Sequence, residues 1–304
     1  MPEDRVNQPH LDLAALPTHD PAVCGEWVAT RFQEMFPQAD ASYIHRRFRA
    51  VKAMFAGEYE GFQPMDTAYH DLEHTLQATL CLVYLLYNRH RADEQPRITA
   101  RDFNIALIAI MLHDMGYLKE RDDTSGTGAK YTHIHEARSC RHARAYLTRR
   151  NWDEAEIREV ERLIACTGPR SNIADIAFAN ETEKILGQAV CTADFIGQMS
   201  DPGYVDKLPT LYREFVESYD YQGLRPEERP FASYEQLLEK TPGFWEHFVK
   251  PRMTNDCGNV WKHLRDPATG DAPYHAAVER NIQRVRDLIG PANHAPATPP
   301  PPPS

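Results

Sequence analysis

The sequence lacks the patterns that mark several classes of protein. Its six cysteines are scattered without C-x-x-C spacing, which argues against a zinc ribbon and against a disulfide framework. Its apolar runs are too short to span a bilayer, and the first residues, MPEDRVNQPH, are too polar to form a signal peptide. These absences predict a cytoplasmic protein that does not enter a membrane.

Basic residues are also in the minority. The chain has 34 lysines and arginines against 44 aspartates and glutamates, which gives a formal net charge of −10. Binding to a nucleic-acid polymer is therefore not expected, because a phosphate backbone requires clustered basic side chains. A small anionic substrate remains compatible with this charge, because a bound metal ion can invert the local field.

The chain shows neither an internal repeat nor the alternating pattern of β-strands, and helical periodicity recurs instead. We expect one all-α domain over residues 21–290, a loose arm over residues 1–20, and a disordered proline-rich tail over residues 291–304. The polar segment 121–130 is expected to be a mobile loop. The expected helices are roughly 22–35, 41–56, 69–90, 99–114, 134–150, 153–165, 181–200, 203–218, 232–249, 252–264 and 273–289.

Histidines and aspartates occur at three places within these expected helices. In YHDLEHT, His70 and His74 are four residues apart and share a helix face, which suits either a metal ligand with a neighbouring acid or two ligands. The apolar run IALIAIML ends in the adjacent pair His113 and Asp114. Asp194 lies inside the apolar segment ILGQAVCTADFIGQM. A buried carboxylate is costly unless it is paired or bound to a metal, so each feature is either an ion pair or a metal ligand.

Taken in order, the three features resemble the HD-domain metal-dependent phosphohydrolases. YHDLEHT is similar to the YHN-x-x-H element of the cyclic-nucleotide phosphodiesterase branch, and TADFIGQMSD also looks like its counterpart there. The resemblance covers about residues 65–220 and implies an all-α HD-domain fold of the phosphodiesterase type. It also implies one or two divalent ions (Mn, Mg, Zn or Fe) that activate water for attack on phosphorus.

The resemblance assigns a role to each of these residues. It implies that the first metal ion is bound by four side chains and that one of them, Asp114, bridges to a second ion where one is present. It implies that His70 protonates the leaving oxygen. The four implied ligands are His74, His113, Asp114 and Asp194.

Other candidates depend on weaker signals. His135 lies where binuclear members of the family have a ligand to the second metal ion, with His133 as a competitor and a solvated histidine as the alternative. Lys119, Lys130 and Gln198 are candidates for substrate binding, although lysines on a loop are usually only solvated.

The sequence departs from the family pattern in two places. Members with two metal ions often have a further histidine before the last aspartate, whereas this chain has Cys166 and Thr167 in that region. This gap makes the second metal ion less securely held and weighs against the diiron oxygenases built on the same scaffold. Phe244 and Trp245 are candidates for a wall that clamps a nucleotide base, but an aromatic pair at this spacing is more often part of the core.

The residues and the resemblance together predict a phosphodiesterase-like hydrolase. Its expected substrate is a small phosphate ester or nucleotide, with His70 as the general acid. Two other functions remain open at this point. One is a diiron oxygenase on the same scaffold, and the other is a non-catalytic ligand sensor that has kept the pocket.

Overall fold

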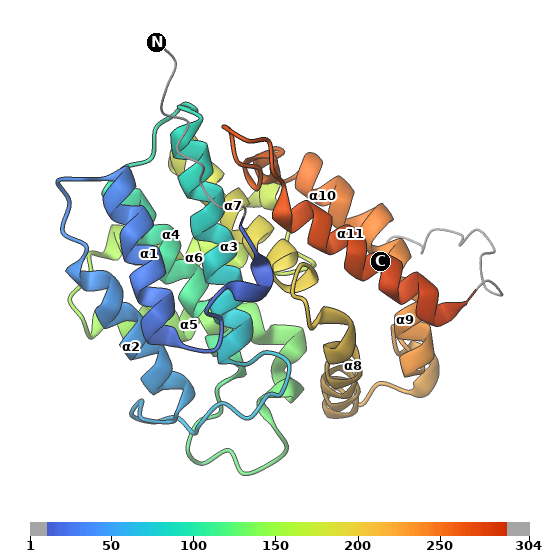
Figure 1. Cartoon of the computed structure of the whole chain (residues 1–304). Helices are drawn as coiled ribbons and strands as arrows, with labels where there is room; N and C mark the ends of the chain where they lie inside the picture. Colours follow the sequence, from blue (N-terminus) through green and yellow to red (C-terminus); the bar gives the residue numbers. More distant parts are fainter. Residues whose placement is uncertain (1–10, 291–304) are drawn as a thin grey trace.

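The protein is built from α-helices, as expected. The computed structural model describes residues 11–290, and among these residues no β-strand forms (Figure 1). The helices are α1 (Pro21–Met35), α2 (Ser42–Phe55), α3 (Leu72–Arg91), α4 (Ala100–Leu112), α5 (His135–Thr148), α6 (Glu154–Ala165), α7 (Glu181–Met199), α8 (Tyr204–Tyr221), α9 (Tyr234–Phe244), α10 (Lys250–Thr254) and α11 (Pro273–Ile289).

The centre of the fold is formed by α3, α4 and α7, most of whose residues are buried. A helix that is apolar around its whole circumference must be covered on every side, and the surrounding helices supply that cover. Helices α3 and α7 pack closely, because a Cβ at Gly197 would lie only 3.0 Å from the Cα of Ala78. This close approach brings the polar residues of the two helices toward one another.

The start of α3 differs from the expected position. The Asp71 carboxylate accepts a hydrogen bond from the backbone N–H of His74 at 2.9 Å and caps the helix, which begins at Leu72 rather than near residue 69. His70 therefore lies in the turn before the helix and not on its first turn. Its ring and that of His74 still lie close together, with centroids 5.4 Å apart.

The expected helix over 252–264 is broken in the structure. Helix α10 ends at Thr254, and the backbone then enters the left-handed region at Gly258 and Asn259, both with φ of 57°. Such a conformation ends a helix, and a short 3₁₀-helix, Val260–His263, follows. The expected helix over 232–249 is present as α9 followed by a π-helical turn, Trp245–Val249.

The expected loose arm is ordered where it is described. Leu11, Leu13 and Leu16 pack against the core, and the Asp12 carboxylate caps the short 3₁₀-helix Leu13–Ala15. Residues 1–10 and the proline-rich tail 291–304 lie outside the described residues.

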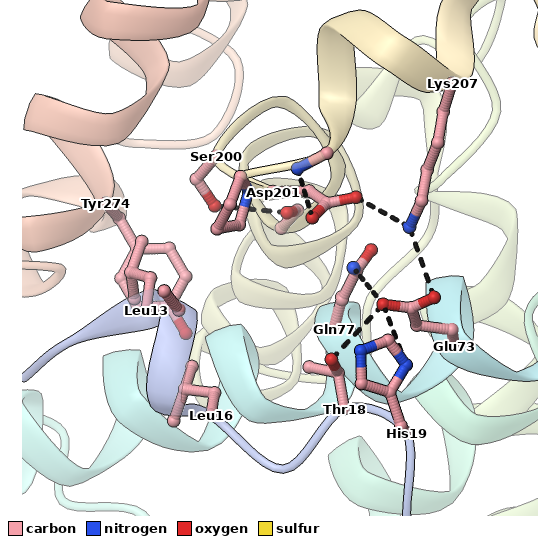
Figure 2. Close-up of a pocket in the computed structure, with 14 residues that line it drawn as sticks. Leu13, Leu16, Thr18, His19, Glu73, Gln77, Ser200, Asp201, Lys207 and Tyr274 are labelled. Carbon is pink, nitrogen blue, oxygen red and sulfur yellow. Dashed lines mark hydrogen bonds and ion pairs between the residues drawn. The ribbon is translucent and has the colours of Figure 1, made fainter.

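This N-terminal segment covers one side of a cavity of about 290 Å³ (Figure 2). Lys207 of α8 joins the cavity walls, since its Nζ lies 2.7 Å from Asp201 Oδ2 and 3.3 Å from Glu73 Oε2. The other carboxylate oxygen of Glu73 accepts hydrogen bonds from Thr18 and Gln77. The charged groups of this cavity are thus paired with one another and tie α8 to α3 and α7.

Within residues 11–290, no helix is both long enough and apolar enough to cross a membrane.

Candidate metal centre

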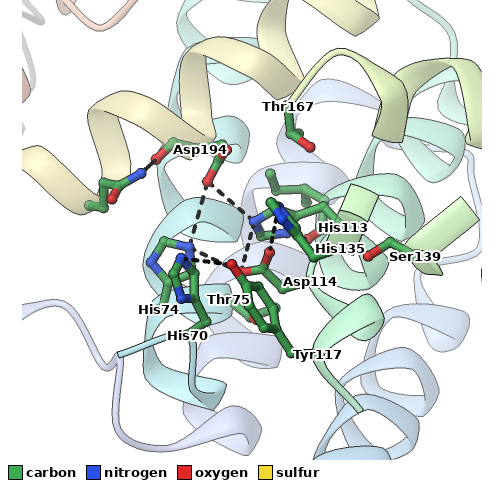
Figure 3. A network of polar contacts seen from close by, with 12 residues as sticks. His70, His74, Thr75, His113, Asp114, Tyr117, His135, Ser139, Thr167 and Asp194 are labelled. Atoms are coloured by element: carbon green, nitrogen blue, oxygen red, sulfur yellow. Dashed lines mark hydrogen bonds and ion pairs between the residues drawn. The ribbon is translucent and has the colours of Figure 1, made fainter. Parts of the chain in front are cut away.

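Four side chains from three central helices converge on one buried point (Figure 3). His74 comes from the first turn of α3 and Asp194 from the middle of α7, while His113 and Asp114 follow the last residue of α4. All four residues are at least 91% buried, because none exceeds 9% relative exposure. These are the four residues that the order of histidines and aspartates indicated.

The distances describe a tight cluster with nitrogen and oxygen atoms facing one another. Asp114 Oδ2 lies 3.3 Å from Nε2 of both His74 and His113. Asp194 Oδ1 lies 3.5 Å from His74 Nε2 and 3.2 Å from His113 Nε2. Ligands about 2.1 Å from a shared cation are about 3.0–3.4 Å apart when they are neighbours in its coordination shell. Three of the four separations fall in this range, and the longest, between His74 and Asp194, exceeds it slightly. The ligand atoms that all lie within 4.8 Å of one another are those of His74, His113 and Asp114, with Asp194 at the edge of this group.

Two of these atoms are buried without a hydrogen-bond partner. Although they approach each other, His113 Nε2 and Asp114 Oδ2 form no hydrogen bond with any described residue. His113 Nδ1 donates to the carbonyl oxygen of Ile110 at 2.7 Å, which leaves the lone pair on Nε2 directed into the cluster. A buried polar atom without a partner is costly, and a cation between these atoms would satisfy both. The residues therefore fit a divalent metal ion.

The charges in the cluster are strongly coupled. Burial disfavours the charged form of His74, but the carboxylates of Asp114 and Asp194 outweigh burial and raise the pKa of His74 to about 10. Burial likewise opposes ionisation of Asp194, yet His113 and His74 lower the pKa of Asp194 to about 2. The two carboxylates thus demand positive charge beside them, and a divalent cation would supply it in place of protons.

His135 lies at the edge of this cluster. Its Nε2 is 3.8 Å from Asp114 Oδ1, and its Nδ1 donates to the carbonyl oxygen of Thr132 at 2.7 Å. The free lone pair of His135 therefore faces the carboxylate, as that of His113 does. The competing residue His133 lies instead beside Tyr221, with ring centroids 6.1 Å apart.

His70 is held beside the candidate metal ligands by a residue that the sequence did not single out. Glu214 of α8 is buried, and its Oε2 lies 2.6 Å from His70 Nδ1. Its other oxygen accepts the backbone N–H of Tyr69 at 2.6 Å. Burial opposes ionisation of Glu214, but His70 and these hydrogen bonds lower its pKa. Nδ1 of His70 is thereby fixed as a donor to Glu214, and Nε2 is left for the pocket.

Tyr117 lies against both His70 and His135, whose own ring centroids are 6.3 Å apart. Its ring stacks on both imidazoles, with centroids 4.5 Å from His70 and 4.8 Å from His135. The Tyr117 hydroxyl lies 3.5 Å from His70 Nε2. This stack fixes the planes of the two imidazoles.

The two candidate lysines are placed away from the metal ligands. Lys119 Nζ lies 2.8 Å from Asp66 and donates to the carbonyl oxygen of Gly126, while Lys130 Nζ lies 2.5 Å from Asp123. Both lysines are buried and neither is among the residues that line the pocket described below. Both lysines bond to the segment 121–130, in which residues 121–127 form the expected loop and the last residues begin a 3₁₀-helix, Gly128–Ile134.

A cavity of about 260 Å³ opens beside the cluster and is lined by His70, Asp114, His135 and Asp194. The candidate residue Gln198 also lines it, with its amide oxygen accepting from the Tyr69 hydroxyl at 3.0 Å. Of the two aromatic residues considered as a wall, Phe244 lines the cavity, whereas Trp245 is buried in the core.

Gly116 is required where the chain passes His135. A Cβ at residue 116 would lie 1.9 Å from the carbonyl oxygen of His135, and the backbone of Gly116 also bonds to Arg138 and Ser139. We expect Gly116→Ala to lower the free energy of unfolding by about 3 kcal/mol, because the added Cβ meets a backbone carbonyl group that cannot move aside as a flexible side chain can. Gly243→Ala is the control, since its Cβ would meet only a His247 side-chain atom at 3.9 Å.

The control alanine lies within α9 and should raise stability by about 0.5–1 kcal/mol through its helix propensity. Urea unfolding of both variants measures the difference. Equal stabilities for the two variants would show that the close approach at Gly116 is not required.

The fold and the cluster together define an all-helical protein with a candidate divalent-metal centre. The chain matches the family described as Npun_R2479-like over residues 50–260, and it therefore belongs to that family. The matched region contains the four clustered residues, His70, His135 and Glu214. No curated protein gives a significant match to the sequence.

Proposed function

We propose that this protein is a metal-dependent phosphohydrolase of the HD type that cleaves a small phosphate ester, with diesters preferred to monoesters. One observation carries the proposal. Asp114 and Asp194, the two carboxylates of a buried set that also contains two imidazoles, line the same cavity as a histidine whose Nδ1 is held by a buried glutamate. The set of imidazoles and carboxylates suits a cation, and the histidine held by the glutamate suits proton transfer. Phosphate-ester hydrolysis uses both.

The cation would be held by His74, His113, Asp114 and Asp194. Two nitrogen and two oxygen donors without a thiolate suit Mn, Fe, Zn or Mg more than a soft metal. When bound, such an ion neutralises charge on the phosphoryl oxygens and acidifies water. Asp114 Oδ1 and His135 Nε2 would provide donors for a second ion, because their 3.8 Å separation leaves room for shared coordination.

His70 would carry the proton that the leaving oxygen needs. Glu214 Oε2 accepts from His70 Nδ1 at 2.6 Å and fixes the ring so that Nε2 is the atom that would donate the proton into the cavity. The leaving oxygen takes this proton as its bond to phosphorus breaks. The neutral imidazole that remains is still oriented by Glu214 and by the Tyr117 ring.

The proposal is tested by purifying the protein with each candidate metal and assaying hydrolysis. Mn²⁺, Mg²⁺, Zn²⁺ and Fe²⁺ would be screened with bis-p-nitrophenyl phosphate, p-nitrophenyl phosphate and a nucleotide panel. The expected result is metal-dependent release of p-nitrophenolate, faster from the diester. Absence of hydrolysis with every metal would contradict the proposal. Two irons per chain with oxygen uptake would indicate the oxygenase, and ligand binding without turnover would indicate a sensor.

Glu214→Gln is expected to lower kcat by about tenfold or more, within the 10²–10⁴-fold contribution of a general acid. The amide keeps the size of the side chain but replaces the carboxylate that accepts from His70 Nδ1 and orients its ring. Metal content should not change, because Glu214 is not among the clustered ligands. Glu217→Gln on the same helix is the matched control, since Glu217 bonds to Thr127 and not to His70. Equal loss of kcat in both variants would contradict the role of Glu214.

A further inference from the structure

The cavity beside the candidate metal centre has two chemically different kinds of lining. Asp114, Asp194, His70 and His135 supply polar atoms to it. Much of the remaining lining is apolar and comes from α7, α8, α9 and the segment between α8 and α9, chiefly Phe195, Leu208, Leu211, Phe215, Phe231 and Phe244. A group attached to a phosphate at the metal centre would contact these apolar side chains.

The apolar wall is arranged around aromatic rings. Phe195 directly follows Asp194 on α7, and its ring lies 6.4 Å from that of Phe244. The rings of Phe215 and Phe231, from α8 and the segment after it, are stacked with centroids 5.6 Å apart. These rings offer dispersion contacts and displace water, but they provide no hydrogen bonds to a sugar or a base.

Cationic groups are scarce around this cavity. Among the described residues that line it, Lys240 is the one lysine or arginine, and it donates to the carbonyl oxygen of Pro230 at 2.9 Å. Its Nζ also lies 5.5 Å from the ring centroid of Phe231. Chains of two or three phosphates are usually held by several basic groups. The cavity is therefore poorly suited to nucleoside di- or triphosphates.

The amide group of Gln198, which could hydrogen-bond to a nucleotide base, already has hydrogen-bond partners within the protein. Gln198 accepts from the Tyr69 hydroxyl with its amide oxygen and donates to the Asp194 carbonyl oxygen at 3.3 Å. Thr241 donates its hydroxyl proton to the Leu237 carbonyl oxygen at 2.8 Å. Recognition of a base normally uses polar groups placed to meet its hydrogen-bonding edge. Both side chains instead hold the cavity wall in place.

We infer that the substrate is a phosphate ester of a small apolar alcohol, alkyl or aryl, whose organic arm occupies the wall formed by Phe195, Phe215, Phe231 and Phe244. This inference rests on the proposed function for the reaction, and on the composition of the cavity for the substrate class. The volume of about 260 Å³ suits one modest organic group rather than a polymer or a long lipid.

The test measures binding of a series of methyl-, butyl- and hexylphosphonate to the protein supplied with Mn²⁺. These probes share one anionic head, and each has a single arm that is not hydrolysed. Titration calorimetry should show Kd falling by about threefold to fourfold for each added methylene. Thymidine 5′-monophosphate should bind no more tightly than butylphosphonate. A flat series, or tighter binding of the nucleotide than of hexylphosphonate, would overturn the inference.

Alanine variants test which side chains of the cavity contact the alkyl arm of the phosphonate. Phe215→Ala and Phe231→Ala change partly exposed rings and should reduce the hexyl-to-methyl ratio of affinities by about tenfold. Tyr221→Ala removes an exposed aromatic ring at the end of the same helix as Phe215 and outside the cavity, so it should keep the wild-type ratio. Thermal melting confirms that each variant is folded. Equal ratios in all three folded variants would contradict the assigned wall.

Hydrolysis of bis-p-nitrophenyl phosphate by the same samples separates this inference from the proposed function. Hydrolysis with a flat phosphonate series would leave the phosphohydrolase standing and refute the apolar substrate. A steep series without hydrolysis of any ester would refute the reaction and leave the cavity as a binding site for apolar phosphates or phosphonates.

Discussion

Asp114→Asn is expected to reduce phosphate-ester hydrolysis by at least about 10³-fold and to abolish stable metal binding. Asp114 Oδ2 faces both imidazoles at 3.3 Å, and its other oxygen faces His135. The amide has almost the same shape but lacks the negative charge that a divalent cation requires at the centre of the cluster. Steady-state kinetics and metal analysis of the purified variant measure the two losses.

The matched control for this substitution is Asp153→Asn. Asp153 precedes α6, is exposed, and makes no side-chain capping bond, so its charge is solvated. Its variant should retain both activity and metal. Retention of the metal and of wild-type kcat in Asp114→Asn would contradict the assignment of Asp114 as a ligand.

His70→Asn is expected to lower kcat by about 10²–10⁴-fold while leaving metal content unchanged. Asparagine can still bond to Glu214 but cannot donate a proton to the leaving oxygen. The loss should therefore be larger for an alkyl leaving group than for p-nitrophenolate, which departs without protonation. Assays with both leaving groups on one sample test this dependence. An equal loss for both would show that His70 acts through structure and not as a general acid.

The helices and the four clustered residues were predictable because they follow local patterns. The apolar run that forms α4 ends at His113 and Asp114, and the apolar segment around Asp194 forms α7. Periodicity reports which residues a helix buries, and a charged or imidazole group among them marks a site. The family resemblance supplied the reaction, which remains a proposal.

Glu214 was missed because it lies far from its partner in the sequence, although a local signal was present. It falls on the apolar face of α8, between Leu211 and Ser218, where a carboxylate must find a partner. The identity of that partner, His70, depends on how α8 crosses the start of α3. Which residue contacts a buried carboxylate of this kind is determined by tertiary packing and does not follow from helical periodicity.

Unlike Glu214, which was missed, Lys119 and Lys130 were predicted to bind substrate and do not line the cavity. Lys119 and Lys130 were candidates for phosphate binding because they flank a polar loop after the histidine–aspartate pair. The same loop carries Asp123, which pairs with Lys130, and the carbonyl oxygen of Gly126, which accepts from Lys119. Both ammonium groups therefore already have partners within the protein. The composition of a loop does not show which of its charged groups pair internally, so a lysine there is a weak indicator of a site.

The central claim is that His74, His113, Asp114 and Asp194 hold a divalent cation, and elemental analysis of the purified protein tests it most directly. Wild-type protein and His113→Ala would be dialysed in parallel and their metal-to-chain ratios compared. The account predicts a ratio near one or near two for the wild type and near zero for the variant. Wild-type protein that retains no divalent metal, or a variant that retains as much as the wild type, would contradict it.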